Sequence, residues 1–148
     1  MNVEFGNTGD IDEWMSLVEK IRYNFPGLET NEGIAEHREI VLKFMDKKQA
    51  LCARKDKKIV GVLLFSRGHN MICCLGVLPE YRRCKAATML LEKALSELDK
   101  SKEITVTTFR KDDEKGIAPR ALYRKFGFVE DECIEEFGYP SQRFVLYP

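Results

Sequence analysis

The sequence predicts an α/β protein with a mixed, mostly antiparallel central sheet and helices on both faces. Two amphipathic helical segments occupy most of the chain before residue 50. From Ala50 the apolar period changes, and three short apolar runs separated by polar turns follow. A later strand–helix–strand crossover makes two strands parallel. The expected order is therefore β-α-α-β-β-β-α-β-α-β-β, within a single domain spanning residues 1–148.

The first third of the chain is expected to hold a short strand and two helices. Val3–Phe5 predicts the strand, and Asp10 is placed to cap a first helix over about residues 10–23. Pro26-Gly27 interrupts the helical spacing, and Ile34–Met45 resumes it as a second helix.

The middle third predicts a meander and a crossover. Ala50–Arg54, Lys58–Ser66 and Met71–Val77 are apolar runs joined by short polar segments, which is typical of antiparallel hairpins. An apolar helical face from Ala87 to Leu98 follows, and Glu103–Phe109 is rich in β-branched residues. We expect this last strand to lie parallel to Met71–Val77.

The final third predicts a short helix and two strands. Pro119 near the start and Gly127 just past the end delimit the helix. Phe128–Cys133 and Arg143–Leu146 read as strands that flank a turn over residues 137–141.

The overall charge and cysteine usage exclude several classes of partner. Lys and Arg number 24, as do Asp and Glu, so the formal net charge is zero and nothing favours a nucleic-acid partner. No apolar run approaches the roughly 20 residues that span a bilayer, and the first residues lack a signal-peptide pattern, so we expect no membrane association and a cytoplasmic protein. The five cysteines lack C-x-x-C spacing, so we expect reduced thiols and no metal.

The most informative segment is Leu75–Leu91, which reads as a buried strand, a basic turn that begins with Pro79, and the start of an apolar helix. Free N–H groups at a helix N-terminus, the helix dipole and adjacent cations together suit a phosphate or pyrophosphate. A solvated basic turn before an ordinary helix is the alternative explanation.

This segment resembles the acyl-CoA-binding motif of the GCN5-related N-acetyltransferase (GNAT) superfamily. In that motif a strand ending in hydrophobic-x-Val-x-Pro leads into Arg/Gln-x-x-Gly-x-Gly/Ala and a helix. Pro79, Arg82 and Ala87 match, whereas Lys85 stands where the pattern has its first glycine. A second motif, Ala121-Leu122-Tyr123-x-x-x-Gly127-Phe128, and the order of elements extend the resemblance over nearly the whole chain.

The resemblance implies acetyl-CoA as co-substrate and a primary amine as acceptor, with direct attack in a ternary complex. It implies that main-chain groups of the strand hold the pantetheine arm, and that the basic turn, the N–H groups of residues 84–88 and the Thr88 hydroxyl hold the pyrophosphate. Gly76 either permits close approach of the backbone to the ligand or packs beneath a helix. The implied CoA-binding residues are Leu75, Val77, Arg82, Arg83, Cys84, Lys85, Ala86, Ala87 and Thr88.

The resemblance also implies a general acid. Tyr123 matches the family's tyrosine that protonates the departing CoA thiolate. On periodicity alone, Tyr123 is a core aromatic of a short amphipathic helix.

The general base is open at this point. Strand alternation puts Met71 and Cys73 on the face of the strand that carries Leu75 and Val77, and neither is a useful base. His69, at the loop before that strand, and Glu29, in the loop between the first two helices, are the candidates. Each is also explained as a solvated surface residue, and water is a further alternative.

The acceptor is a small-molecule or peptide amine, and the protein is expected to be a monomer or homodimer. Tyr23, Phe25 and Tyr139 lie in loops that overhang the acceptor side in this family, or else they edge the core. Two other functions are compatible with the sequence. One is a non-catalytic CoA-binding or regulatory module, motivated by Lys85, and the other is a partner-binding domain without a CoA site.

Overall fold

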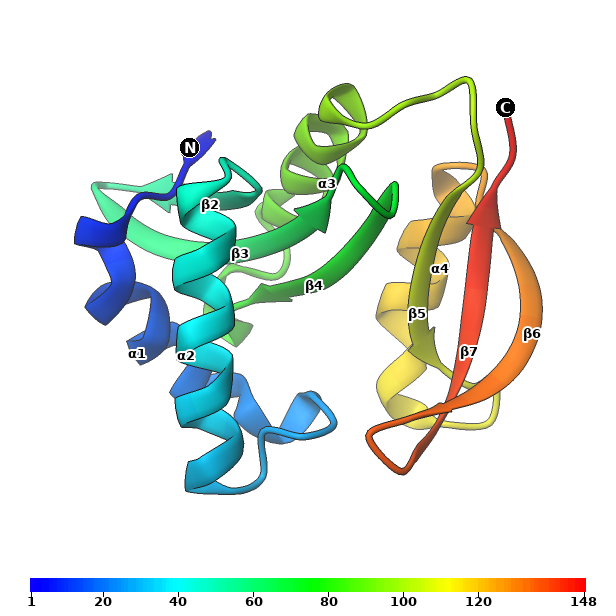
Figure 1. Ribbon diagram of the computed structural model, residues 1–148, viewed down its shortest axis with the longest axis horizontal. Coiled ribbons are helices and arrows are strands. Elements are labelled where there is room, and N and C mark those ends of the chain that lie inside the picture. The colour runs from blue at the N-terminus through cyan, green and yellow to red at the C-terminus, as the bar shows by residue number, and fades with distance from the viewer.

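The computed structural model describes residues 1–148 and has one seven-stranded mixed sheet with helices on both faces (Figure 1). The strand order is β1-β2-β3-β4-β5-β7-β6, and only β4 and β5 pair in parallel. The helices are α1 (Ile11–Ile21), α2 (Asn31–Asp46), α3 (Ala86–Glu97) and α4 (Ile117–Lys125). The strands are β1 (Asn2–Phe5), β2 (Ala50–Lys55), β3 (Lys58–Ser66), β4 (Met71–Val77), β5 (Ile104–Phe109), β6 (Val129–Glu136) and β7 (Tyr139–Leu146). The predicted fold class and order of elements are confirmed.

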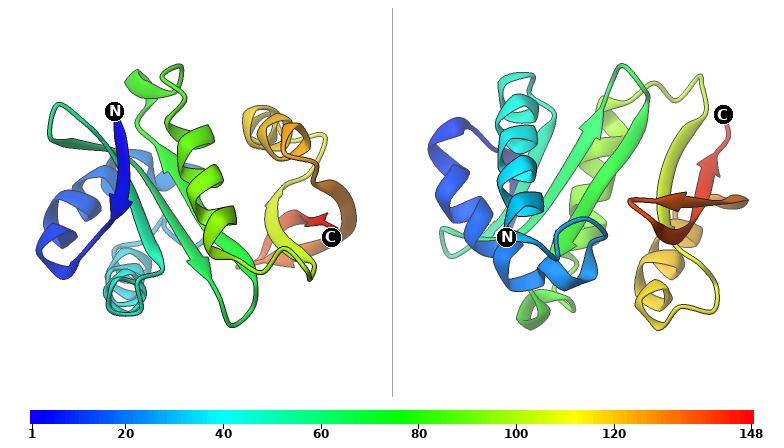
Figure 2. Two further views of the ribbon diagram at one scale, coloured as in Figure 1. Left: turned by 90° about the horizontal axis from the view of Figure 1, so that it is seen from above. Right: turned by 60° about the horizontal axis from the view of Figure 1, so that its bottom comes forward.

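Two apolar clusters hold the helices to opposite faces of the sheet. A cluster of 15 buried residues joins α1 and α2 to one face, and Trp14 is its largest fully buried side chain. A cluster of 18 buried residues joins α3 and α4 to the other face. Figure 2 shows α1 and α2 on one side of β1–β4 and α3 on the other. None of the helices is long and apolar enough to cross a bilayer.

The start of α1 differs from the prediction, because a 3-10 turn over Thr8–Asp10 precedes the helix. Asn7 caps this turn by accepting a hydrogen bond from the Gly9 amide, and Asp10 accepts one from the Asn7 amide. Asp10 makes no side-chain cap to α1 and instead pairs with Arg54 at 2.8 Å. Asp10, predicted as the cap of this helix, therefore forms an ion pair that holds the start of α1 to β2.

The turn between β6 and β7 is shorter than predicted. Only Phe137 and Gly138 connect the strands, with φ values of +53° and +74°. Positive φ at both central residues defines the type I′ turn, whose twist suits a tight hairpin. The expected turn over residues 137–141 is wrong because Tyr139 and Pro140 already pair with Glu136 and Glu135.

A β-bulge interrupts β4. Cys74 lies opposite Leu64 and Ile72 lies opposite Phe65, so Cys73 is an extra residue without its own partner. The bulge changes the alternation, so that Ile72 joins Leu75 and Val77 in the α3 cluster. The expectation that Met71 and Cys73 share that face is therefore wrong.

Candidate functional site

A cleft opens inside the sheet between β4 and β5. The two strands pair only where Met71 lies opposite Thr105 and Ile72 opposite Val106. Beyond these pairs the strands diverge toward the bottom of Figure 1 and separate the β1–β4 part of the sheet from the β5–β7 part. The bulge at Cys73 lies at the point of divergence.

The edge of β4 that faces the cleft carries free main-chain groups. Just past the end of β4, the Leu78 amide donates to the Val60 carbonyl of β3 at 2.9 Å, so this pair of residues continues the ladder as a hydrogen-bonded pair. Bonded pairs alternate along an antiparallel ladder, so the main-chain groups of Leu75 and Val77 point away from β3, toward the cleft. An extended ligand can therefore pair with β4 as a further strand would.

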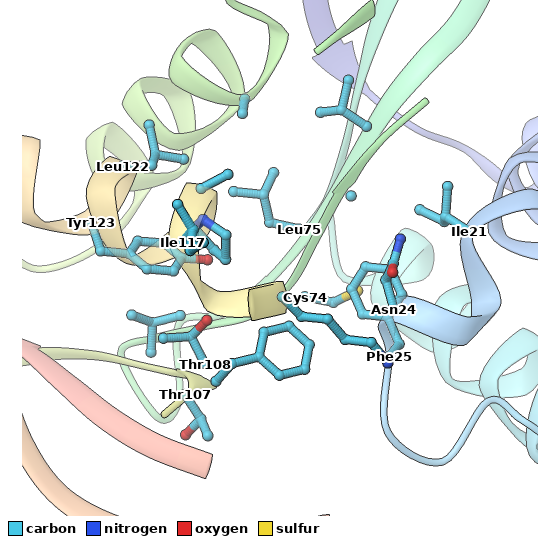
Figure 3. A pocket seen from close by; sticks show the side chains of 18 of the residues that line it. Ile21, Asn24, Phe25, Cys74, Leu75, Thr107, Thr108, Ile117, Leu122 and Tyr123 are labelled. Carbon is cyan, nitrogen blue, oxygen red and sulfur yellow. The ribbon is translucent and has the colours of Figure 1, made fainter. Parts of the chain in front are cut away.

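Side chains turn the cleft into a cavity of about 580 Å³, within the usual range for small-molecule sites. Its walls come from five parts of the chain, represented by Phe25 before α2, Leu75 of β4, Thr88 of α3, Thr108 of β5 and Tyr123 of α4. Figure 3 shows Tyr123 and Ile21 on opposite sides of this space, with Leu75 and Cys74 between them.

One end of the cavity combines free main-chain donors with positive charge. The amides of residues 85–88 at the start of α3 have no hydrogen-bond partner in the protein, and the first helical bond runs from the Met89 amide to the Lys85 carbonyl. Arg82, Lys85 and Thr88 line the cavity beside them. The arrangement combines free donors, the positive end of the helix dipole and two cations.

Three residues of the predicted phosphate loop do not line the cavity: Arg83, Cys84 and Ala86. The Cys84 amide donates to the Tyr81 carbonyl at 3.1 Å, so it is used within the turn, contrary to the expectation that it is free. Ala86 is fully buried in the core and contributes only its amide. The free donors are therefore residues 85–88 and not 84–88.

Lys85 adopts the backbone conformation that favours glycine, with φ +64° and ψ +17° at the N-cap of α3. The turn thus keeps the path that a glycine would give it, although the residue has a side chain.

Tyr123 is oriented by the way α4 ends. Gly127 has φ +96°, its amide donates to the Arg124 carbonyl, and the Phe128 amide donates to the Tyr123 carbonyl at 3.0 Å. These two bonds form a Schellman motif, in which an apolar contact joins the same two ends. Here that contact is between the Tyr123 and Phe128 rings, whose centroids are 5.7 Å apart. The spacing Tyr-x-x-x-Gly-Phe therefore fixes the orientation of the Tyr123 ring through the end of α4.

Tyr123 is both a core residue and a cavity residue. It is 4% exposed, belongs to the α3 and α4 cluster, and lines the cavity. Burial raises the pKa of its phenol, and the nearby Cys74 adds to this effect. The hydroxyl therefore keeps its proton at neutral pH and can act as a proton donor.

Arg120 positions α4 and was not identified from the sequence. It is 4% exposed and donates to the Phe109 carbonyl at 3.0 Å and to the Gln142 side chain at 2.7 Å. These bonds tie α4 to β5 and β7, so the helix that carries Tyr123 is fixed to the wall of the cleft.

The structure separates the two predicted bases. His69 is exposed in the β3–β4 turn, and its amide donates to Ser66. It does not line the cavity, because it precedes β4 at the end where β4 and β5 still pair. Glu29 is exposed and lines a smaller adjoining cavity.

Gly76 packs beneath a helix. A Cβ atom there would lie 2.5 Å from the Ile21 side chain and 3.0 Å from Phe25. The glycine therefore makes room for the protein's own side chains.

Glu136, at the end of β6, is a cavity residue that the sequence analysis did not identify. It lines the main cavity, and its carboxylate has no hydrogen bond or ion pair with the protein. Burial raises its pKa. Burial also raises the pKa values of Cys73 and Cys74, and the charge of Glu136 adds to both shifts. The only available signal was the Phe137-Gly138 pair, which predicts a tight turn but not which strand lies beside it.

Comparison with known proteins identifies the family. The model of the acetyltransferase (GNAT) domain matches residues 46–130, which is more than half of the chain, and the chain belongs to this family. No match is found among curated protein sequences.

Solved structures share the fold over nearly the whole chain. A GNAT-family acetyltransferase from Bacillus cereus has a TM-score of 0.75 at 19% identity, over 97% of this chain and 94% of that one. One from Streptococcus agalactiae has a TM-score of 0.78 at 13% identity, over 99% and 95%. The PaiA N-acetyltransferase of Thermoplasma acidophilum, solved with coenzyme A, has a TM-score of 0.70 at 18% identity, over 96% of each chain.

Proposed function

We propose that this protein transfers an acetyl group from acetyl-CoA to a primary amine by direct attack in a ternary complex. The observation that carries the proposal is the cleft between β4 and β5. It joins an open strand edge, free amides at the start of α3 and a protonated tyrosine in one cavity.

The residues present fit the parts of acetyl-CoA. The main-chain groups of Leu75 and Val77 suit the amides of an extended pantetheine arm. The amides of residues 85–88, with Arg82 and Lys85, suit its pyrophosphate. Bound acetyl-CoA would supply the activated acetyl group.

Tyr123 has the properties of the general acid. A tyrosine hydroxyl carries its proton at neutral pH, and α4 holds the ring in the cavity through Gly127 and Arg120. In this proposal the phenol gives that proton to the thiolate as it departs.

The conformation of the turn at Lys85 supports CoA binding. It argues against the alternative that a lysine in place of the motif glycine prevents the turn from binding CoA. Because Lys85 takes up the left-handed conformation, the amides of α3 keep the direction that a glycine would allow. The rival of a module without a CoA site has no comparable support.

Two measurements test the proposal. Calorimetric titration with acetyl-CoA is expected to show saturable binding, and its absence would leave only a structural role. Thiol release across a panel of amines is then compared between the wild type and Tyr123→Phe. We expect the variant to bind acetyl-CoA normally and to lose about 10²- to 10⁴-fold in kcat, the usual contribution of a positioned proton donor.

Tyr147→Phe is the matched control, because Tyr147 is 55% exposed and lies outside the cavity. It should leave turnover unchanged. Equal turnover in the wild type and Tyr123→Phe would remove Tyr123 from the mechanism.

A further inference from the structure

A second cavity of about 220 Å³ adjoins the main one, and half of its lining residues are aromatic. Four of its eight lining residues are aromatic: Tyr23, Phe25, Phe109 and Tyr139. Aromatic residues make up only 10% of the chain, so the lining is strongly enriched in them. Such a surface suits an apolar, and above all an aromatic, ligand group.

The walls of this second cavity are held in place before any ligand binds. The Phe109 and Tyr139 rings meet edge to face, with centroids 5.8 Å apart, and the Tyr139 hydroxyl donates to Asp113 at 2.6 Å. The Lys115 ammonium donates to the Tyr23 carbonyl at 3.0 Å and lies over the Tyr139 ring. These contacts join the α1–α2 loop, the β5–α4 loop and the β6–β7 hairpin, which form the walls of the second cavity.

The charges around the second cavity do not suit a polycation. Lys115 and Glu29 are its only charged lining residues, and Glu29 is exposed to solvent. A polyamine would need several carboxylates to replace the water around its ammonium groups. The second cavity therefore favours an acceptor whose bound part, apart from its reacting amine, is uncharged.

A carboxylate of the main cavity lies on the hairpin that also forms a wall of the second cavity. Phe25, Phe109 and Lys115 are among the residues that line both. Glu136 of the main cavity is the cross-strand partner of Tyr139 of the second one, so the two side chains leave the hairpin on the same side. Figure 3 shows Phe25 beside Cys74 in the main cavity.

We infer that the acceptor is a small primary monoamine that carries an aromatic group, with its ring in the second cavity and its ammonium beside Glu136. This inference rests on the proposed function, since it assigns the acceptor of the same site.

The chemistry balances with the groups present. The ammonium loses one proton to the Glu136 carboxylate, and the freed nitrogen forms a bond to the acetyl carbon. The carbon–sulfur bond breaks, and the CoA sulfur takes a proton from Tyr123. The amide nitrogen loses its second proton, through water, to the tyrosyl oxygen, and Glu136 releases its proton to solvent, so the enzyme returns to its starting state.

The first experiment compares acceptors. Thiol release is measured with 2-phenylethylamine, n-butylamine, putrescine, spermidine and a lysine-containing peptide. We expect kcat/KM for 2-phenylethylamine to exceed that of each other amine by about tenfold or more, the effect of a well-placed aromatic contact. Equal or better use of spermidine or the peptide would overturn the inference while leaving the acetyltransferase proposal intact.

Phe25→Leu is expected to reduce the preference for 2-phenylethylamine over n-butylamine several-fold. Because Phe25 also lines the main cavity, the Kd for acetyl-CoA is measured for the same variant, and the two amines are compared at saturating acetyl-CoA. Phe137→Leu is its control, because Phe137 is an exposed aromatic of the same region that lines neither cavity. An unchanged preference in Phe25→Leu would contradict the aromatic compartment.

The second experiment tests Glu136 through the pH profile. The titratable groups nearest to it are Cys73 and Cys74 of β4 and its cross-strand partner Tyr139 of β7. Glu114 and Lys115 of the β5–α4 loop are charged residues that line the same cavity. The wild-type kcat/KM should fall as pH drops through the raised pKa of Glu136, because the protonated carboxyl accepts no proton.

Glu136→Gln should lose about 100-fold at pH 7 and recover toward the wild type at alkaline pH, where free amine is abundant. Glu135→Gln, on the exposed side of the same strand, should match the wild type. A uniform loss at every pH would mark Glu136 as structural and overturn its role.

Binding separates failure of this inference from failure of the proposed function. If no amine releases thiol, ligand-observed NMR of 2-phenylethylamine with the CoA-loaded protein still decides the question. Saturable binding that Phe25→Leu weakens would support the compartment, and no binding would overturn it.

Discussion

Replacing Lys85 with glycine should stabilise the protein. Lys85 has φ +64°, a conformation that costs a non-glycine residue about 1–2 kcal/mol. Glycine removes this cost but adds conformational freedom to the unfolded chain, worth about 0.4–1 kcal/mol. The difference predicts a gain of about 0.5–1 kcal/mol in the free energy of unfolding, or about 1–4 °C in Tm.

Urea and thermal unfolding measure this gain, and Lys20→Gly is the matched control. Lys20 is exposed within α1, where glycine should cost about 1 kcal/mol, so the two substitutions should have opposite signs. A loss of stability in Lys85→Gly similar to that in Lys20→Gly would refute the left-handed conformation at this turn.

The Lys85→Gly variant also tests how much the Lys85 side chain contributes to acetyl-CoA binding at the start of α3. Four free amides remain in Lys85→Gly, and the exposed Lys85 ammonium can add only an exposed ion pair with the phosphate, worth about 0.2–1 kcal/mol. The Kd for acetyl-CoA should therefore change by less than about fivefold. A much larger loss of affinity would make the Lys85 ammonium a principal contact.

Two further glycine substitutions should have the opposite effect on stability. Gly76→Ala places a Cβ 2.5 Å from Ile21 and 3.0 Å from Phe25, so overpacking should cost about 1–3 kcal/mol in urea unfolding, and an unchanged midpoint would contradict the packing. Gly127→Ala forces φ +96° on alanine and should cost about 1 kcal/mol while lowering kcat through Tyr123. Normal kcat with reduced stability would show that the end of α4 does not orient the phenol.

Local signals in the sequence were sufficient for most of the fold. The basic turn and the free start of α3 follow from Pro79 and the apolar spacing after it, which involve only neighbouring residues. Gly127 predicted the end of α4 because left-handed residues at helix ends favour glycine.

The errors arose where distant segments meet. Alternation along β4 failed at Cys73 because the bulge depends on pairing with β3, which a single strand does not reveal. His69, a candidate base on the sequence alone, precedes β4 at the end where β4 still pairs with β5, so it does not line the cavity. Glu136 was missed because β7 inserts between β5 and β6, and only this topology brings the hairpin to the cleft.

Asp10 illustrates the same limit on a smaller scale. Its position predicts a helix cap, but Arg54, more than forty residues later, takes its carboxylate instead. A charged partner supplied by tertiary structure overrides a local preference.

The most direct test of the account is a crystal structure with acetyl-CoA. The pantetheine arm should lie between β4 and β5, with its pyrophosphate over the amides of residues 85–88 and its sulfur within hydrogen-bond reach of the Tyr123 hydroxyl. Acetyl-CoA bound outside this cleft, or a sulfur beyond the reach of Tyr123, would contradict the central claim that this cleft is the acetyl-transfer site.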